Sequence, residues 1–412
     1  MPTELSAPRS LAESEFDQFF SLDELAFGSE PQSAALREID KQLLEADRTI
    51  GVFDGPQIVG GASIFTFEMT VPGGRVPLAG VSWVSVMPTH RRRGILRSMM
   101  RHQLHGLHES GGEAVAGLTA TEPPIYGRFG YGLASRSAQL TIPRSHSALR
   151  KPQGIDAVTL RLIPTAQSLE LCEQIYARQL LTRPGMLVRT AEWAKVCIAD
   201  PDEWRAGRSK MRTVLAECDG QAVGYAHYRI KRQFGMPTPT GDVGVAELYA
   251  DDAASYAALL EYLTSIDLTN TTSLPGIPLD GPPMHLLENV RAASPRVRDA
   301  MYVRLVDIDR ALASRTYSAQ IDVVIDVADP FCPWNAGRWR LAGGEKGATC
   351  ERTTAVPDLA LGVRELGSVF LGGNSLAALG AAGLVEERRS GALAEASRAF
   401  ATDLEPWLSF GY

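Results

Sequence analysis

The sequence predicts a mixed fold of the α/β or α+β class, divided into three domains. Segments with helical periodicity alternate with strand-like segments that are rich in valine, isoleucine and aromatic residues. At 412 residues, the chain is too long for one ordinary domain. One pair of strand patterns occurs twice, and the last segment differs in texture from both copies. We therefore expect two related units followed by a separate α+β domain.

The first domain, residues 1–148, is expected to start with two helices and to continue as a sheet. The connections "DGPQ" and "PGGR" carry the glycine and proline that favour tight turns between strands. The expected elements are helices over residues 10–26 and 34–46, strands over 48–54, 58–71 and 76–86, and a helix over 94–108.

The second domain, residues 149–295, follows a polar stretch and repeats the first. "QIVGGASIFTF" and "AGVSWVSVMP" in the first domain have the counterparts "QAVGYAHYRI" and "VGVAELYADD" at a similar separation. The first copy continues with three arginines, whereas the second continues with two aspartates and small residues, "DDAASYAAL". We predict that the second copy is degenerate and does not bind the anion that the first one binds.

The third domain, residues 296–412, contains "AMYVRLVDIDRALASR" near its start, at residues 300–315. Two strand-like stretches, "QIDVVIDV" and "GRWRLAG", follow, and then glycine- and alanine-rich helical stretches. The chain finishes with an aromatic tail, "LEPWLSFGY". This order is typical of an α+β domain.

Charge and cysteine usage restrict the partners and the compartment. A formal net charge of −7 argues against nucleic acid as a partner, because nucleic-acid binding needs a basic surface, and it favours cationic ligands. None of the five cysteines forms a CxxC pair, so neither a disulfide framework nor a thiolate metal site is expected. With no signal-peptide pattern and no apolar run of about 18 residues, we expect a cytoplasmic protein without a membrane span.

The stretch "VSWVSVMPTHRRRGILRSMM", residues 81–100, predicts an anion site. Pro88 ends the strand, and Gly94 allows a tight turn before an apolar helical face begins. A helix N-terminus carries unpaired N–H groups and partial positive charge, and arginines add charged donors, so the turn suits a pyrophosphate. The alternative is a solvated charge cluster, which the helix dipole would disfavour without a ligand. The chain has no GxxxxGK[ST], so this is not a nucleotide P-loop.

These residues also resemble a known family. "VMPTHRRRGILRSMM" resembles the pyrophosphate motif of the GNAT superfamily of N-acetyltransferases, R-x-x-G-x-G/A, with Leu96 where a small residue is usual. Taken with "IYGRFGYG", the degenerate second copy and the aromatic tail, the whole chain resembles the enhanced intracellular survival family of aminoglycoside N-acetyltransferases. The resemblance implies tandem GNAT-type domains, a last domain similar to sterol carrier proteins, and a homohexamer.

The resemblance also implies a reaction: direct transfer of acetyl from acetyl-CoA to primary amines of aminoglycoside-like polyamines, at several positions, in a ternary complex and without a metal. Tyr126 matches the family's general acid, and the carboxylate of Tyr412 matches its general base. Composition alone would instead pack Tyr126 beside Phe129 and Tyr131. The implied cofactor contacts are Val84, Ser85, Val86, Arg92, Arg93, Gly94, Ile95, Leu96, Arg97, Thr121 and Glu122.

For the substrate we expect contacts from Phe27 and Glu30, because "LAESEFDQFFSLDELAFGSE" combines acidic and aromatic residues that suit a cationic amine. The resemblance adds Trp83, which stands where the family has a smaller aromatic residue. Trp407 and Phe410 are expected to anchor the tail. The histidines at 102, 105 and 108 fan across one helix face, so we interpret them as packing or solvated residues and not as metal ligands.

Two other functions remain open from the residues. A protein-lysine acetyltransferase would use the same chemistry on a different acceptor. A lipid or sterol carrier would use the apolar surface of the last domain, with the first domain vestigial; the intact arginine run in the first copy argues against it.

Overall fold

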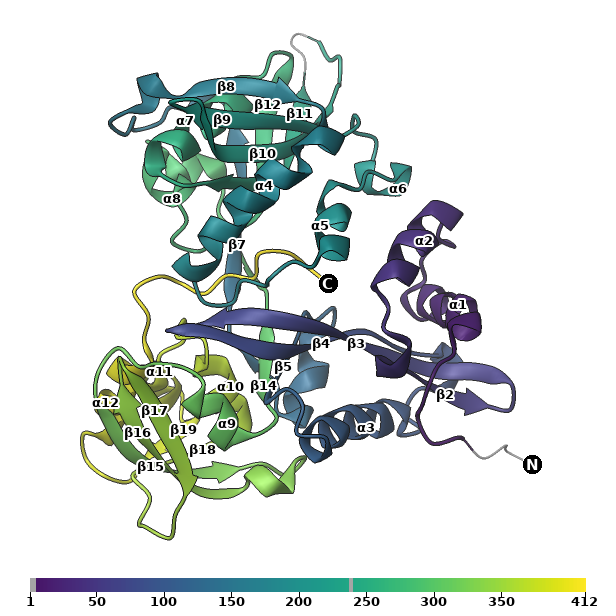
Figure 1. Ribbon diagram of the computed structural model, residues 1–412, viewed down its shortest axis with the longest axis vertical. Helices are drawn as coiled ribbons and strands as arrows, with labels where there is room; N and C mark the ends of the chain where they lie inside the picture. Colours follow the sequence, from purple (N-terminus) through teal and green to yellow (C-terminus); the bar gives the residue numbers. More distant parts are fainter. Residues whose placement is uncertain (1–4, 237–239) are drawn as a thin grey trace. The chain divides into compact units, whose positions relative to one another are not determined.

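A computed structural model describes residues 5–236 and 240–412 of the chain (Figure 1). These residues form two compact units. The first unit contains the chain up to Ser135, the short segment Pro184–Leu187, and Ala300–Tyr412. The second unit contains Arg136–Arg183 and Val188–Asp299. Three sheets, interspersed with helices, give the mixed α/β architecture that the alternating sequence pattern predicted.

The first sheet of the first unit has the strand order β1-β2-β3-β4-β5-β14-β6. β14 is a strand from beyond the second copy, and it lies between β5 and β6, antiparallel to both. The helices of this part are α1 (Phe16–Phe27), α2 (Ala34–Leu43) and α3 (Ile95–Glu109). The strands are β1 (Arg9–Ser10), β2 (Thr49–Asp54), β3 (Gln57–Val71), β4 (Gly74–Val86), β5 (Val115–Leu118), β6 (Gly132–Leu133) and β14 (Tyr302–Leu305).

The predicted helix over residues 10–26 was wrong at its start. Ser10 lies in β1, where it pairs with Ile50 of β2, and a 3₁₀ turn over Glu13–Glu15 precedes α1. The Glu15 carboxylate accepts hydrogen bonds from Arg9 and from the N–H of Ala12, so this turn has its own stabilising contacts. The other predicted elements of this domain agree with the structure to within a few residues at each end.

Two neighbouring glycines on β3 allow helices to pack closely on both faces of the sheet. A β-carbon at Gly60 would collide with Ile95 of α3, and one at Gly61 would lie 2.7 Å from the Phe19 ring of α1. Since successive side chains of a strand point to opposite faces, α3 and α1 lie on opposite sides of β3. Figure 1 shows α3 along this sheet.

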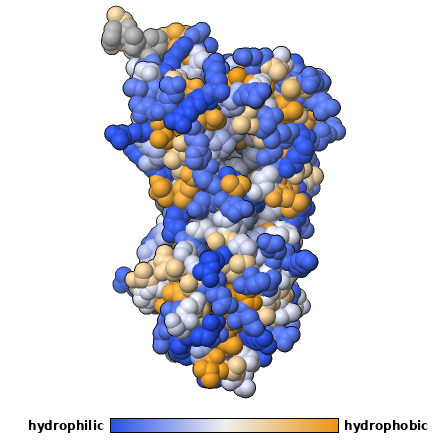
Figure 2. All heavy atoms as spheres, turned by 90° about the vertical axis from the view of Figure 1, so that its left-hand side faces the viewer, coloured by the Kyte–Doolittle hydropathy of each residue, from blue (hydrophilic) through white to orange (hydrophobic). Residues whose placement is uncertain are grey.

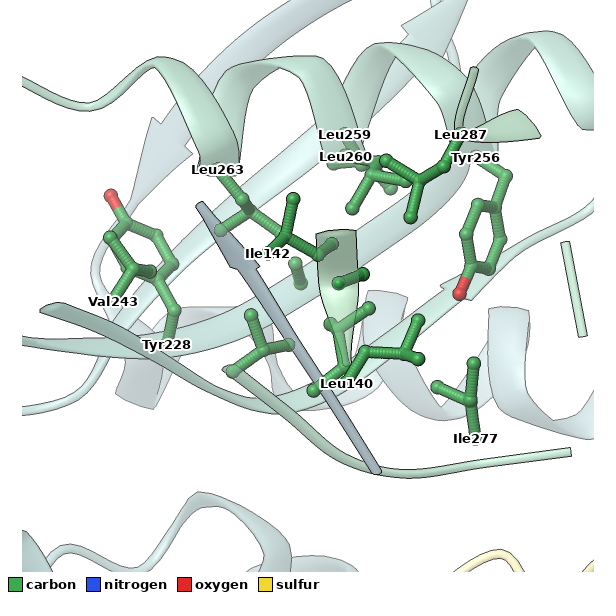
Figure 3. Packing of buried hydrophobic residues seen from close by; sticks show 14 of the residues in the cluster. Leu140, Ile142, Tyr228, Val243, Tyr256, Leu259, Leu260, Leu263, Ile277 and Leu287 are labelled. Carbon is green, nitrogen blue, oxygen red and sulfur yellow. The ribbon is translucent and has the colours of Figure 1, made fainter. Parts of the chain in front are cut away.

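The second unit holds one sheet in the order β13-β7-β12-β11-β10-β9-β8. Its core packs α7 against the strands, as Figure 3 shows for Leu259, Leu260 and Leu263 above Leu140 and Ile142. The helices are α4 (Thr165–Gln179), α5 (Ala191–Ile198), α6 (Asp202–Arg205), α7 (Ala253–Ser265) and α8 (Pro283–Leu286). The strands are β7 (Arg136–Pro143), β8 (Thr159–Ile163), β9 (Arg212–Cys218), β10 (Gln221–Lys231), β11 (Gly241–Ala250), β12 (Thr269–Ile277) and β13 (Arg296–Asp299).

Strand register confirms the internal duplication. Gly60 pairs with Val86 in the first copy, and Gly224 pairs with Ala250 at the matching place in the second. Both strand pairs then shift register a few residues further on, which marks a β-bulge in the same region of each copy. The repeated sequence pattern therefore reflects a repeated structure.

The third sheet belongs to the first unit and has the order β17-β16-β15-β18-β19. The predicted strands "QIDVVIDV" and "GRWRLAG" are confirmed as β15 and β16. The strands are β15 (Ile321–Ala328), β16 (Gly337–Gly344), β17 (Gly347–Arg352), β18 (Leu359–Gly362) and β19 (Val385–Glu387). The helices are α9 (Ile308–Ala313), α10 (Val363–Val369), α11 (Leu376–Ala381) and α12 (Ala392–Phe400).

A buried arginine holds the point at which the C-terminal tail leaves α12. The Arg315 guanidinium donates hydrogen bonds to the carbonyl oxygens of Phe370, just after α10, and of Phe400, the last residue of α12. Burial lowers the pKa of Arg315 to about 10, and the negative ends of two helix dipoles favour the charge that remains. The tail therefore starts from a fixed position.

The surface is polar on the face drawn in Figure 2, where hydrophobic residues form small separate groups. Within residues 5–236 and 240–412, no helix is both long and apolar enough to cross a membrane.

Candidate active site

The strands β4 and β5 separate at the centre of the first sheet. They pair in parallel from Leu78 opposite Val115 to Gly80 opposite Gly117. β4 then continues to Val86, whereas β5 ends at Leu118. The backbone of β4 beyond Gly80 therefore has an edge that β5 does not cover. Such an edge offers N–H and C=O groups to an amide-bearing ligand.

The residues predicted to bind the cofactor along β4 lie on this part of the strand. Trp83, which was predicted to contact the substrate and not the cofactor, is the bulge residue, with a φ of 53°. Its ring lies 5.4 Å from Phe20 and 5.9 Å from Phe19 of α1. Val84 and Val86 are half-buried. Ser85 is buried, and its hydroxyl has no hydrogen-bond partner in the part of the chain that the structure describes. A buried hydroxyl of this kind needs a partner, and a ligand can provide one.

The arginine turn lies between β4 and α3, as predicted. Gly94 is the N-cap of α3 with a φ of 85°, and no side chain caps the helix, so its first N–H groups point to the exposed turn. Arg91 donates to the carbonyl oxygen of Ala26 at 3.1 Å, and Arg93 lies 3.8 Å from Asp54. Arg92, with a φ of 64°, has no hydrogen bond or ion pair with any residue that the structure describes. The turn therefore combines cationic side chains with open helix N–H groups.

The rest of the predicted cofactor set differs in exposure. Ile95 is buried in the core, so only its main chain can face a ligand, and Leu96 is half-buried. Arg97 is exposed, with its guanidinium carbon 5.5 Å from the centre of the Phe331 ring. Thr121 and Glu122 lie on the exposed turn that follows β5.

Tyr126 follows Glu122 on a 3₁₀ segment, Pro123–Phe129. Its ring is half-buried and meets the ring of Tyr131 edge-on, with the centroids 6.0 Å apart. Burial, together with the nearby Glu122 charge, raises the pKa of Tyr126 to about 12. The phenol is therefore protonated throughout the physiological pH range.

The aromatic tail brings Tyr412 to the point where β4 and β5 separate. A β-carbon at Gly80 would lie 3.1 Å from the Tyr412 ring, and one at Gly117 would lie 3.2 Å from its hydroxyl oxygen. The ring also packs on Phe67 of β3, with centroids 5.0 Å apart. Burial, and secondarily Tyr131, raises the pKa of the Tyr412 phenol. Tyr126 packs, together with Val84 of β4, against the apolar cluster that contains Tyr131.

The tail anchors were predicted from the three aromatic residues near its end. Phe410 packs on Phe67 with ring centroids 6.1 Å apart, and the N–H of Trp407 donates to the carbonyl oxygen of Pro184 at 2.8 Å. Each of these contacts lies within the first unit. The tail is thus attached at more than one point.

Two expected substrate residues, Phe27 and Glu30, lie at the surface. Phe27, at the end of α1, is 53% exposed, and Glu30 is exposed just beyond it. In the described part of the chain, neither has a hydrogen bond, an ion pair or a ring contact with Tyr126 or Tyr412. They lie close in sequence to Ala26, the residue that Arg91 binds.

The acids of the first helical segment, Asp23 and Glu24 among them, were expected to attract a cationic amine, but sequence reasoning did not predict that they gather with Asp40 between α1 and α2. Glu24 is buried and accepts hydrogen bonds from Arg37 and from the N–H of Gln32. Burial raises the pKa of Asp23 to about 6, with further contributions from the Glu24 and Asp40 charges. Burial likewise raises the pKa of Asp40 to about 6. These carboxyls gather only when the two helices pack, and the sequence spacing of 23 and 40 does not reveal that contact.

Tyr131 was treated only as a packing neighbour in the sequence. Its hydroxyl is fully buried and, like that of Tyr412, lacks a hydrogen-bond partner among the described residues. Its position in "GRFGYG", five residues after Tyr126, was the available sequence signal.

Two of the three histidines on α3, His105 and His108, pack against other side chains. The rings of His105 and His108 lie 4.8 Å and 4.1 Å from the ring of Trp334, and His108 contacts Asp307 at 2.5 Å. Over residues 5–236 and 240–412, no group of three or more His, Cys, Asp or Glu residues is arranged to hold a metal ion.

Comparison with protein-family models gives three matches along the chain. Residues 7–134 match an acetyltransferase (GNAT) domain, and residues 185–305 match a second model with the same description. Residues 308–409 match a sterol carrier protein domain. The tandem arrangement predicted from the sequence is confirmed.

Related proteins match over most of the chain. A Streptomyces avermitilis protein described as an uncharacterized N-acetyltransferase is 48% identical over 94% of this chain and 95% of its own length. The N-acetyltransferase Eis of Mycobacterium tuberculosis is 33% identical over 88% of both chains. The crystal structure of Eis1 from Mycobacterium abscessus matches with a TM-score of 0.83 and 33% identity, over 99% of this chain and 100% of that one.

Proposed function

Since the chain belongs to the Eis family of GNAT-type N-acetyltransferases, we propose that it transfers acetyl from acetyl-CoA to primary amines of aminoglycoside-like polyamines. The observation that supports this most directly is the position of Tyr412 at the point where β4 and β5 separate, on the strand that leads into the arginine turn. Tyr126 packs with Val84 of the same strand against one apolar cluster. An acyl carrier held along the open edge of β4 would have both tyrosines within its reach.

Several features fit acetyl-CoA, which supplies the reactive acetyl thioester. The α3 N-terminus lacks a side-chain cap, and Arg92 has no partner among the described residues, so both suit a pyrophosphate. The open backbone from Val84 to Val86 suits the amide groups of pantetheine, and the buried Ser85 hydroxyl lacks a protein partner there. We assign the cofactor contacts to these groups, with Thr121 and Glu122 on the neighbouring turn.

We assign the two tasks of the reaction to two different residues, Tyr412 and Tyr126. The acceptor amine must lose a proton before it attacks, and we assign this role to the main-chain carboxylate of Tyr412. Tyr126 donates a hydrogen bond to the sulfur as negative charge develops on it. With a pKa of about 12, the phenol is a weaker acid than an ordinary thiol with a pKa of about 8.5. Complete proton transfer from Tyr126 to a free thiolate would thus be uphill, and hydrogen-bond stabilisation is its main contribution.

A cationic acceptor suits the charges around α1 and α2. Asp23, Glu24 and Asp40 lie close enough together to raise the pKa of Asp23. A bound ammonium group would relieve this repulsion, because a nearby positive charge lowers the pKa of a carboxyl. The net charge of −7 adds long-range attraction for polyamines.

The decisive experiment measures release of free CoA thiol from acetyl-CoA, with protein whose C-terminus is untagged. The acceptors are an aminoglycoside panel, simple diamines and lysine-containing peptides. We expect amine-dependent release of more than one thiol per aminoglycoside. Acetyl-CoA binding without release on any aminoglycoside would contradict the proposed acceptor, and release on peptides alone would identify a protein-lysine acetyltransferase.

A truncated chain that lacks Gly411 and Tyr412 tests the assignment of the base. We expect it to bind acetyl-CoA with unchanged affinity and to lose at least about 100-fold in kcat, the size of a general-base contribution. Full turnover by this chain would rule out the Tyr412 carboxylate. The homohexamer that the resemblance implies is a separate prediction, which light scattering of the intact protein checks.

A further inference from the structure

The short segment Pro184–Leu187, here called the clasp, is bound to the end of β3 by hydrogen bonds from both the main chain and the side chain of Thr70. The N–H of Thr70 donates to the carbonyl oxygen of Met186 at 2.8 Å, and the N–H of Gly185 donates to the carbonyl oxygen of Thr70 at 2.8 Å. The Thr70 hydroxyl accepts from the Met186 N–H at 2.9 Å and donates to its carbonyl oxygen at 3.2 Å. Thr70, Met186 and Leu187 are all buried.

The clasp also binds the C-terminal tail. The Pro184 carbonyl oxygen accepts from the Trp407 N–H at 2.8 Å, and the Leu187 N–H donates to the Ser409 hydroxyl at 3.2 Å. Gly185 has a φ of +89°, and a β-carbon there would lie 3.1 Å from the Trp407 carbonyl oxygen. Glycine is therefore required both for this backbone conformation and for the close approach of the tail.

These contacts have a direct effect on the end of the chain. Residues 401–412 contain neither helix nor strand, and an unsupported chain end frays. Ser409 is attached to the clasp three residues before Tyr412, which leaves only a short length of chain free to move. The Tyr412 ring then packs on Phe67, Gly80 and Gly117.

We propose that Ser409 is a positioning residue for the reaction: through the Leu187 N–H of the clasp, it holds the tail so that the Tyr412 carboxylate meets the acceptor amine. The clasp, anchored by Thr70, thus makes a segment between α4 and α5 part of the support of the active site. This inference rests on the proposed function, because it assumes that the Tyr412 carboxylate is the base.

The first test compares Ser409→Ala with Ser409→Thr. The alanine variant loses the acceptor of one neutral hydrogen bond, so we expect kcat to fall about five-fold. The dissociation constant of acetyl-CoA should be unchanged, and the threonine variant should keep wild-type kcat because it keeps the hydroxyl. Ser265→Ala is the control, since the Ser265 hydroxyl likewise makes a neutral hydrogen bond with the main chain, here as donor to the carbonyl oxygen of Tyr262 at the end of α7. Wild-type kcat in Ser409→Ala would overturn the inference.

The second test measures the order of the tail without measuring turnover. Carboxypeptidase releases a C-terminal tyrosine only when the tail is accessible, and mass spectrometry follows the loss of Tyr412. We expect release to be about five-fold faster from Ser409→Ala than from the wild type, and unchanged in Ser409→Thr and Ser265→Ala. Equal release from all variants would also overturn the inference.

The same experiment separates this inference from the proposed function. If wild-type protein stays active after Tyr412 has been removed, the terminal base is wrong, and the positioning role falls with it. If activity is lost in step with Tyr412, but Ser409→Ala changes neither release nor kcat, the base stands and only the role of Ser409 fails. A Thr70→Ser variant, which keeps the buried hydroxyl, is expected to match the wild type in both measurements.

Discussion

Two residues of the candidate site have backbone conformations that ordinary side chains rarely adopt. Trp83 and Arg92 both have positive φ values, of 53° and 64°. Such a conformation costs on the order of 1 kcal/mol per residue unless the surroundings enforce it. The bulge at Trp83 redirects β4 where it leaves β5, and the turn at Arg92 exposes the guanidinium beside the α3 N-terminus. Both residues thus lie where the chain changes direction at the candidate site.

Arg92 should contribute to acetyl-CoA affinity and not to chemistry. Arg92→Gln removes one cation from the pyrophosphate site, so we expect KM for acetyl-CoA to rise about ten-fold while kcat changes less than two-fold. The effect should shrink at high salt because exposed charges are screened. Arg101→Gln, an exposed position further along α3, is the control. Equal changes in both variants would indicate a general charge effect.

Tyr126 should affect the chemical step. Tyr126→Phe removes the donor to the sulfur, and we expect kcat to fall about 100-fold with acetyl-CoA affinity within two-fold of the wild type. Because the pKa of Tyr126 is about 12, the wild-type rate should not decline through loss of this proton below about pH 10. Pre-steady-state measurement of acetyl transfer checks both points. A Phe variant that weakens binding and kcat equally would instead indicate a packing role.

The sequence was most informative about residues whose role depends on neighbours in the chain. The arginine turn needs only a strand, a glycine and a helix in succession, and all three are visible in residues 81–100. The raised pKa of Asp40 could not be predicted, because it depends on burial between two packed helices. The unpartnered hydroxyl of Tyr131 could not be predicted either, since it depends on side chains from distant strands.

At the scale of elements, the two copies differ at one helix N-terminus. In the first copy, Gly94 leaves the α3 N-terminus without a side-chain cap. In the second, the Asp252 carboxylate accepts a hydrogen bond from the Ser255 N–H at 2.7 Å and so occupies the N-terminus of α7. A helix end already capped by a carboxylate repels a phosphate group. This is the physical basis for the predicted degeneracy of the second copy.

The Asp252 cap should therefore affect the stability of the second unit and not the catalytic rate. Asp252→Ala is expected to lower the free energy of unfolding of the second unit by about 1 kcal/mol, and Asp252→Ser should restore most of it. The kcat of the enzyme should stay within two-fold of the wild type in both variants. Urea unfolding and the thiol-release assay measure the two quantities. A large loss of activity in the alanine variant would mean that α7 supports catalysis.

The boundaries of helices and strands could be predicted where they depend only on local sequence patterns. The long strands β3 and β4 were visible from their apolar residues and from the glycines between them. The start of α1 was missed because Ser10 pairs with Ile50, and a pairing partner forty residues away leaves no local signal. Register between distant strands is set by tertiary packing and not by local propensity.

At the scale of the whole molecule, the second unit contains a buried titratable group that should make it sensitive to acid. His227 is fully buried and hydrogen-bonded to Thr213 at 2.9 Å. Burial lowers the pKa of His227 to about 4. An unfolded histidine has a pKa of about 6.5, so the unfolded chain binds a proton before the folded chain does.

The stability of the second unit should therefore be complete above about pH 6.5 and should fall as the pH drops toward 4. The expected loss from His227 alone is about 2 kcal/mol at pH 5. Hydrogen–deuterium exchange at pH 7 and pH 5, corrected for intrinsic rates, should show it as faster exchange in β9 and β10. In His227→Gln, this pH dependence should be reduced. An unchanged pH dependence in the variant would assign the effect to other groups.

The number and type of domains could be predicted from the sequence, because the repeated strand pattern and the change in composition each extend over long segments of the chain. The insertion of segments from distant parts of the chain into the first unit could not be predicted. β14, a strand of four residues, lies between β5 and β6 of the first sheet although the whole of the second copy separates them in the sequence. The clasp is a second such case, since its hydrogen bonds to Thr70 join positions more than one hundred residues apart.

The position of β14 has a consequence for how the protein is made. A ribosome that has released residues up to Leu133 has supplied β5 and β6 but not the strand that separates them. The first sheet can close only after Tyr302–Leu305 has emerged from the exit tunnel, so the N-terminal third of the nascent chain must wait, with part of its core unpaired, while the second copy is synthesised. Chaperone demand during translation should be greatest in that interval.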